Sequence, residues 1–431
     1  MRNGSNYAIL YSIVWGVFFF KNFRKYGKYS ISVFVTFFYL LYSILAIILY
    51  NHVEYVSDFN TLTLFPYVYL FLMILLSLRP VITYDKSDVQ GLIVPTPSVI
   101  HTFTYCFIFL AIILLPSAIH DMKSGITMLL LDSDGGADLY LDAHGGGPTQ
   151  RSIADVPKFL FDMFSYISIL IFYYYLTQAR LKKWVLIGLS ITMLYNMLRP
   201  ISLGLRTDTV MTIFAILAGF VLMRKWIPQR RRKILVIIGT SFGGLIVSLL
   251  MILSISRFSN SAGGVSGTNL DYIAQSSLNF NNYGLDAGGI RYGDRTCRIF
   301  KKYLGFENVP SGIIERRRMY FKMKMNDGVF YTFVGDFTLD FGPIITVFIF
   351  IIYSLWFTHM SKIKNGVISF SKMLVVYLAI LIPLQGGMYL FTFSDGGNYT
   401  LMAFLFTAIL FNCVDNRKLT RNILWISNKN K

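Results

Sequence analysis

Long apolar stretches separated by short polar ones run along almost the whole chain. A helix needs about 20 apolar residues to cross the hydrocarbon core of a bilayer. Eleven segments reach or approach that length, so the pattern predicts an all-α polytopic membrane protein with about 11 transmembrane helices. These segments are residues 5–20, 30–50, 61–78, 99–119, 159–177, 184–198, 209–223, 234–254, 339–358, 373–391 and 398–414.

The composition favours the same class of protein. Of the 431 residues, 55% are hydrophobic and 14% are charged, whereas soluble globular proteins carry about 25% charged residues. This excludes a soluble enzyme, a disordered chain and a disulfide-rich secreted domain. The three cysteines, Cys106, Cys297 and Cys413, lie far apart in the sequence. We therefore expect no structural disulfide and no metal cluster.

Basic residues concentrate in alternate connections between the apolar segments: 21–28, 79–86, 180–183, 224–233, 362–372 and the tail from 417. With the flanking residues Asp88 and Asp415 included, these connections hold more than half of the 40 Lys and Arg residues but only three of the 22 acidic ones. Because cytoplasmic connections carry the excess of Lys and Arg, we expect the N-terminus outside and the C-terminus in the cytoplasm. The net charge of +18 then needs no nucleic-acid partner.

We expect residues 1–431 to form a single integral membrane domain with two substantial outer loops. Residues 120–158 are acidic and glycine-rich, and include His144 as a candidate proton acceptor. Residues 255–328, the large loop, are basic. Guanidinium groups suit phosphate oxygens, so Arg257, Arg291 and Arg295 are candidate ligands of a lipid diphosphate. The alternative is a solvated loop that contacts anionic headgroups.

A second candidate site lies between two short apolar segments, at residues 199–208. Arg199 opens this segment, and Pro200 and Gly204 are expected to break the helix, so that the chain dips into the membrane and re-emerges. Arg206 then lies at the N-terminus of the following helix, which is an anion-binding position. The alternative is an interfacial arginine with a buried stem and a solvated head.

A third candidate site opens the ninth segment, at residues 329–343. Asp336 and Asp340 lie four residues apart, on one face if the segment is helical. A carboxylate at the boundary of the membrane raises the free energy of the folded protein unless it forms an ion pair or takes part in function. One of the two is therefore a candidate general base. A salt bridge to a loop arginine remains the alternative.

Three segments resemble the bacterial oligosaccharide repeat-unit polymerases, the Wzy-type O-antigen and capsule polymerases. The first is Leu203-Gly204-Leu205-Arg206-Thr207 before an apolar helix. The second runs from Asp271-Tyr272-Ile273 through Leu278-Asn279-Phe280-Asn281 to Gly293-Asp294-Arg295-Thr296. The third combines Tyr331-Thr332 with Asp340-Phe341-Gly342. Pro343 departs from the pattern, where a small or apolar residue is expected, and is compatible with the first turn of a helix.

The resemblance implies a multi-pass glycosyltransferase of the bacterial inner membrane that is active at the periplasmic face. It would transfer the growing glycan from undecaprenyl diphosphate to the non-reducing end of a new lipid-linked repeat unit, without a cofactor or metal. Arg206 would neutralise the diphosphate, with Arg257, Arg291 and Arg295 as helpers. Asp336, Asp340 and His144, in that order, are the expected bases, and Tyr331 would position a sugar. The expected partners are the lipid-linked oligosaccharide, the bilayer and a chain-length regulator.

Other functions remain open at this point. An O-antigen ligase uses the same donor and differs in its acceptor. Another polyprenyl-dependent glycosyltransferase would use an acidic residue in the first outer loop, where Glu54 and Asp58 lie. A lipid-linked oligosaccharide flippase is disfavoured because the apolar segments carry almost no charge. A structural membrane subunit is the remaining alternative.

Overall fold

The structure, a computed structural model, describes residues 2–52, 59–131, 155–258, 263–363, 365–389, 394–416 and 423–426. His144, Glu54 and Asp58 lie outside the described residues, as does most of the acidic loop predicted at 120–158. Among the described residues the chain is largely helical, as the apolar pattern predicts.

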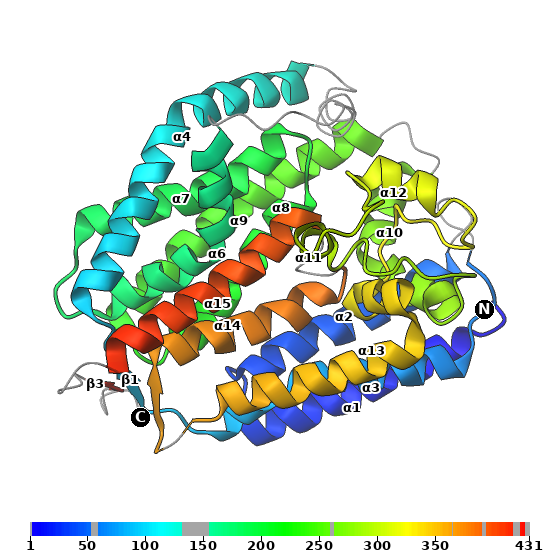
Figure 1. The fold of residues 1–431 in the computed structure, drawn as a ribbon, viewed down its shortest axis with the longest axis horizontal. Helices are drawn as coiled ribbons and strands as arrows, with labels where there is room; N and C mark the ends of the chain where they lie inside the picture. Colours follow the sequence, from blue (N-terminus) through cyan, green and yellow to red (C-terminus); the bar gives the residue numbers. More distant parts are fainter. Residues whose placement is uncertain are drawn as a thin grey trace. The chain divides into compact units, whose positions relative to one another are not determined.

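Each of the eleven predicted segments falls on a helix (Figure 1). Eight of these helices, within the described residues, are long and apolar enough to cross a membrane: α2 (Ile31–Asn51), α3 (Leu64–Lys86), α4 (Pro97–Leu131), α6 (Val156–Thr177), α7 (Lys183–Ser202), α9 (Gln229–Phe258), α13 (Thr332–Ser361) and α15 (Ser394–Asn416). Helices α8 (Thr207–Met223) and α14 (Phe370–Gly386) are apolar but shorter, and α1 (Ser5–Tyr26) has 22 residues. The chain therefore has the character of a multi-pass helical membrane protein.

The chain divides into two compact units. Unit 1 comprises residues 1–88, 262–364 and 375–402, and unit 2 comprises residues 89–261, 365–374 and 403–431.

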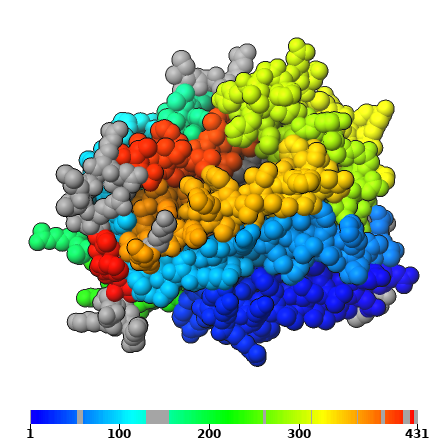
Figure 2. Space-filling view, turned by 60° about the horizontal axis from the view of Figure 1, so that its bottom comes forward, coloured from blue at the N-terminus to red at the C-terminus, as the bar shows by residue number. Residues whose placement is uncertain are grey.

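In unit 1, α1 packs along α2 and α3, and α13 packs along α3. Figure 2 shows α3 lying between α1 and α13 on one face of this unit. The core contains Trp15, whose ring stacks on Tyr39 at 4.7 Å between centroids. At the start of α2, the Ser30 side chain accepts a hydrogen bond from Val33 N, and the Asp85 carboxylate accepts one from Ser32 N at 2.7 Å. These contacts satisfy amide groups that the first helical turn leaves without partners.

The large loop is more ordered than a solvated loop. It contains α10 (Gly264–Asn279), a π-helix (Phe280–Gly284), α11 (Arg298–Tyr303) and α12 (Ile313–Met319). The second half of α10 is buried, and this helix packs against α2. Helix α9 extends into the predicted loop as far as Phe258 and includes Arg257.

Helix α13 consists of two parts joined at a kink. Gly342 has φ 79° and ψ 162°, a conformation that only glycine adopts easily. Pro343 follows it and begins the second part, as expected for proline in the first turn of a helix. Asp336 and Asp340 therefore lie on the short first part, ahead of the long apolar part.

In unit 2, α4 packs against α6 and α7, and α8 packs against the same two helices. The expected helix break at Pro200 is wrong, because α7 continues through Pro200 to Ser202. The break lies at Gly204, which has φ 68°. Its amide donates to Ile201 O, and Leu205 N donates to Pro200 O at 2.8 Å. This is a Schellman ending, in which a glycine in the left-handed region closes one helix before the next begins.

Three short strands in unit 2 were not predicted. β1 (Gly91–Ile93) pairs in parallel with β2 (Val367–Ser369) and antiparallel with β3 (Ile423–Trp425). The register pairs Leu92 with Ile368 and with Leu424. The sheet links three connections that are far apart in the sequence, and strands of three residues are too short to show a clear alternation of apolar and polar positions.

Candidate functional site

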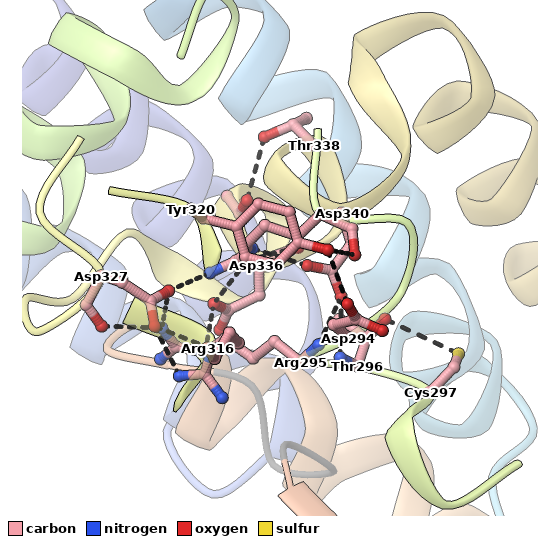
Figure 3. Close-up of polar contacts among 12 residues, drawn as sticks. Asp294, Arg295, Thr296, Cys297, Arg316, Tyr320, Asp327, Asp336, Thr338 and Asp340 are labelled. Carbon is pink, nitrogen blue, oxygen red and sulfur yellow. Dashed lines mark hydrogen bonds and ion pairs between the residues drawn. The ribbon is translucent and has the colours of Figure 1, made fainter. Parts of the chain in front are cut away.

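A buried cluster of three arginines and three aspartates lies in unit 1, and Figure 3 shows most of its members. Arg291 is at its centre and is 0% exposed. Its Nε lies 2.7 Å from Asp340 Oδ1, and its Nη1 contacts Asp327 Oδ1. Its Nη2 lies 3.8 Å from Asp336 Oδ1. One guanidinium thus contacts three carboxylates.

The other two arginines complete the charge balance. Arg295 Nε lies 2.9 Å from Asp336 Oδ1. Arg316 directs both Nε and Nη2 to Asp327 Oδ2, each at 2.7 Å. All six side chains are buried. Buried charges are tolerated only when they are paired and hydrogen-bonded, and this cluster contains three charges of each sign.

Asp340 also binds backbone amides of the large loop. Its Oδ2 accepts hydrogen bonds from Thr296 N at 2.7 Å and from Arg295 N at 3.2 Å. A backbone hydrogen bond also joins the large loop to α13, because Arg291 N donates to Leu339 O at 2.9 Å. Asp340 therefore ties the large loop to the first part of α13. Both of its oxygens are engaged, which is unfavourable for a general base.

The electrostatics of the cluster stabilise its ionised form. Burial alone would raise the pKa of Asp327, but Arg291, Arg295 and Arg316 outweigh this effect and lower the pKa below its usual value. Burial acts to lower the pKa of Arg291, and the carboxylates of Asp340, Asp327 and Asp336 reverse this and raise it. Asp327 is therefore ionised at neutral pH and paired with arginines.

Two further ion pairs extend the network. Lys301 Nζ contacts Asp294 Oδ1, and the Tyr320 hydroxyl donates to Asp294 Oδ2 at 2.6 Å. Arg298 Nε lies 2.8 Å from Asp395 Oδ1. The latter pair joins α11 to the first turn of α15, within unit 1.

Arg206 and Arg257 lie in unit 2 and have different surroundings. Arg206 immediately precedes α8 and is 7% exposed. Its Nη1 donates to Ser254 Oγ at 2.9 Å, and its guanidinium carbon lies 4.5 Å from the centre of the Phe258 ring. Arg257 Nη1 donates to Gly204 O at 2.9 Å, and its guanidinium lies 4.9 Å from the same ring. Two guanidinium groups therefore contact one aromatic ring near the N-terminus of α8.

Arg199 belongs to a polar group in unit 2 as well. Its guanidinium lies 5.9 Å from the Tyr195 ring. Arg199 interacts electrostatically with Asp162 and Lys158, both of α6. Asp208 of α8 also interacts electrostatically with Asp162. Helices α6, α7 and α8 thus contribute charges to one region.

The predicted site residues fall into two groups. Arg291, Arg295, Asp336 and Asp340 meet in unit 1, whereas Arg199, Arg206 and Arg257 belong to unit 2. The salt bridges proposed as the alternative for Asp336 and Asp340 are present.

Tyr331 belongs to unit 1 but lies in an apolar core. It is 1% exposed and packs in a cluster with Ala287, Met325 and Leu339. Its hydroxyl thus has little access to a sugar. The next residue, Thr332, has φ 67°, which is strained for a β-branched side chain.

Sequence reasoning missed Asp327, Ser254 and Phe258. Asp327 follows Asn326 and precedes Gly328, a pattern that indicates a turn and not an ion-pair centre. Ser254 and Phe258 lie in an apolar helix, four residues apart and therefore on one face, but nothing in the sequence relates that face to Arg206. Within the described residues, no group of three or more His, Cys, Asp or Glu side chains is arranged to hold a metal ion.

Comparison with protein-family models, curated proteins and solved structures gave no match.

Proposed function

We propose that the protein is an oligosaccharide repeat-unit polymerase of the bacterial inner membrane. It transfers a growing glycan from undecaprenyl diphosphate to the non-reducing end of a new lipid-linked repeat unit, at the periplasmic face. The observation that carries this proposal is the placement of the Arg206 and Arg257 guanidinium groups 4.5 and 4.9 Å from the centre of one ring, that of Phe258, near the N-terminus of α8.

The proposed topology has eleven transmembrane helices, with the N-terminus outside and the C-terminus in the cytoplasm. The excess of Lys and Arg in alternate connections supports it. The α7–α8 turn and the large loop then face the periplasm, where the lipid-linked substrates are presented. A chain-length regulator is the proposed protein partner, and no cofactor is required.

The chemistry needs positive charge where the glycosidic bond breaks, because the leaving group is a diphosphate. Arg206 donates a hydrogen bond to Ser254 Oγ and Arg257 donates one to Gly204 O, and their guanidinium groups lie 4.5 and 4.9 Å from the centre of the Phe258 ring. Guanidinium groups held this way are preorganised for phosphate oxygens, and the helix N-terminus adds a favourable dipole. Loss of one such donor typically lowers the rate about 10²- to 10³-fold.

In this proposal the unit 1 arginines have a positioning role. Arg291 and Arg295 are neutralised by Asp336, Asp340 and Asp327, so binding phosphate would require them to release carboxylates in a buried site. We therefore assign this cluster to holding the large loop on α13. His144 is then the sequence-derived candidate for the base that activates the acceptor hydroxyl.

The test uses cells in which the chromosomal gene is deleted and variants are supplied on a plasmid. Wild type should restore long polysaccharide chains. Arg206→Ala should leave single repeats, and Arg206→Lys should largely fail, because an ammonium cannot make a two-pronged contact. Arg230→Ala, at an exposed arginine in the first turn of α9, is the control and should behave as wild type. Protein levels are checked by immunoblot.

Two outcomes would contradict the proposal. Long chains with Arg206→Ala would remove Arg206 from the site. Unattached long chains in the deletion strain would indicate a lost ligase, because polymerisation would then continue without this protein.

A further inference from the structure

Tyr292 is an exposed aromatic residue in an otherwise buried segment. It is 67% exposed, whereas the other five residues from Arg291 to Thr296 are buried. Most of its side chain is therefore open to solvent and adds little buried apolar area to the fold.

The backbone at Tyr292 is in a costly conformation. Tyr292 has φ 52° and Gly293 has φ 83°, and Asp294 N donates to Arg291 O at 3.0 Å. This is a β-turn in which both central residues have positive φ, as in type I′ turns. Asn, Asp and Gly are favoured at the first central position, and a bulky aromatic residue there is strained.

Buried contacts on both sides hold this turn. Arg291 precedes Tyr292 and is fixed by three carboxylates, and its carbonyl also accepts from the Tyr320 hydroxyl at 3.1 Å. Asp294 closes the turn and contacts Lys301 and Tyr320. A Cβ at Gly293 would lie 3.1 Å from the Phe341 ring, so the backbone approaches α13 closely. A strained backbone conformation persists where contacts with the surrounding structure hold it in place. Such conformations are common at ligand sites.

We propose that Tyr292 is a carbohydrate-binding residue that stacks on a pyranose ring of the glycan, and that the buried charge cluster holds it in place. This inference rests on the proposed function and adds a contact for the substrate. A tyrosine ring offers a flat apolar face and a hydroxyl, and it loses little conformational freedom on binding. Lys301 and Tyr320 next to the turn are polar and partly exposed, which favours a polyhydroxylated ligand over an acyl chain.

The test compares Tyr292→Phe, Tyr292→Leu and Tyr292→Asn in the complementation assay and as purified proteins. The binding probe is the repeat-unit oligosaccharide released from its lipid carrier by mild acid, and thermal unfolding is measured in detergent. Tyr303→Asn is the matched control, because Tyr303 is 66% exposed and lies in helix α11 of the same loop.

Tyr292→Asn should unfold at a higher temperature than wild type, because Asn tolerates positive φ. It should nevertheless bind the oligosaccharide at least tenfold more weakly and produce shorter chains. Tyr292→Phe should retain most binding, and Tyr292→Leu should lose it. Tyr303→Asn should change neither binding nor chain length.

Wild-type binding and chain length with Tyr292→Asn would overturn the inference. Full binding by Tyr292→Leu would also overturn it, because any apolar side chain would then suffice, as in contact with lipid. These outcomes differ from failure of the proposed function, in which wild type itself would not restore polymer.

Discussion

Arg291 and Asp340 form a fully buried ion pair, 2.7 Å between Nε and Oδ1, that joins the large loop to the first part of α13. Both side chains are 0% exposed. Because Asp340 also accepts from Thr296 N, the pair fixes a side chain and a backbone segment of the loop together. The turn that carries Tyr292 begins at Arg291, so the ion pair and the exposed ring are adjacent in the chain.

Replacing Arg291 with Met should strongly destabilise unit 1. The change leaves buried carboxylates without their central cation, which typically costs about 3–5 kcal/mol. Lys324→Met is the matched control, because Lys324 forms a solvent-exposed pair with Asp286 and should change stability little. Reversible unfolding of the purified proteins in mixed micelles measures both. Equal stability of the two variants would show that the buried cluster does not stabilise the fold.

The cluster should make stability sensitive to acid. The pKa of Asp327 is lowered in the folded protein, so its ionised form contributes stability above the unfolded pKa, about 3.9. That contribution should be lost as the pH falls below about 4, through the folded pKa. Melting temperatures of wild type and Asp327→Asn between pH 7 and pH 3 measure the effect. The variant should be less stable at pH 7 and should lose less on acidification, and parallel curves would contradict the assignment.

The kink in α13 should depend on Gly342. A Cβ there would meet Ile290 only at 3.8 Å, so the cost of Gly342→Ala comes from the positive φ and not from a clash. The expected loss is about 1 kcal/mol or more. Gly239→Ala, within helix α9 and with no atom within 4 Å of the new Cβ, is the control and should be neutral or slightly stabilising. The opposite order of stabilities would indicate that α13 does not need the kink.

The proposed topology predicts which positions react from outside. In a variant with Cys106, Cys297 and Cys413 replaced by Ser, a cysteine at Lys324 should react with a membrane-impermeant maleimide in intact spheroplasts. A cysteine at Arg230 should react only after permeabilisation. Both positions are exposed, so a difference in labelling reports sidedness. The reverse pattern would invert the proposed orientation.

The helices could be predicted from sequence because a run of apolar residues is a local signal. The ends of α7 and α9 were harder to predict. Helix α7 continues past Pro200 because a proline near the end of a helix is tolerated when Gly204 closes it two residues after Ser202. Helix α9 extends to Phe258 because Ser254 and Arg257 continue the helix although they are polar. Polarity alone therefore does not show where the helix ends.

The site was predicted less completely, because pairing depends on tertiary contacts. Asp336 and Asp340 were expected either to act as bases or to pair with loop arginines, and only the fold shows that Arg295 and Arg291 reach them. Asp327 lies nine residues before Asp336, in a turn. No pattern in the sequence indicates that it pairs with Arg316. The assignment of Arg206 to a different unit from Arg291 is likewise a property of the fold.

The most direct test of the account is a reaction with purified protein in a lipid nanodisc. Wild type and Arg206→Ala are incubated with an undecaprenyl-diphosphate-linked repeat unit, and the products are identified by mass spectrometry. We expect wild type to form lipid-linked dimers and longer oligomers with release of undecaprenyl diphosphate, and Arg206→Ala to leave the single repeat unchanged. Equal product formation by the two proteins would show that Arg206 does not stabilise the departing diphosphate.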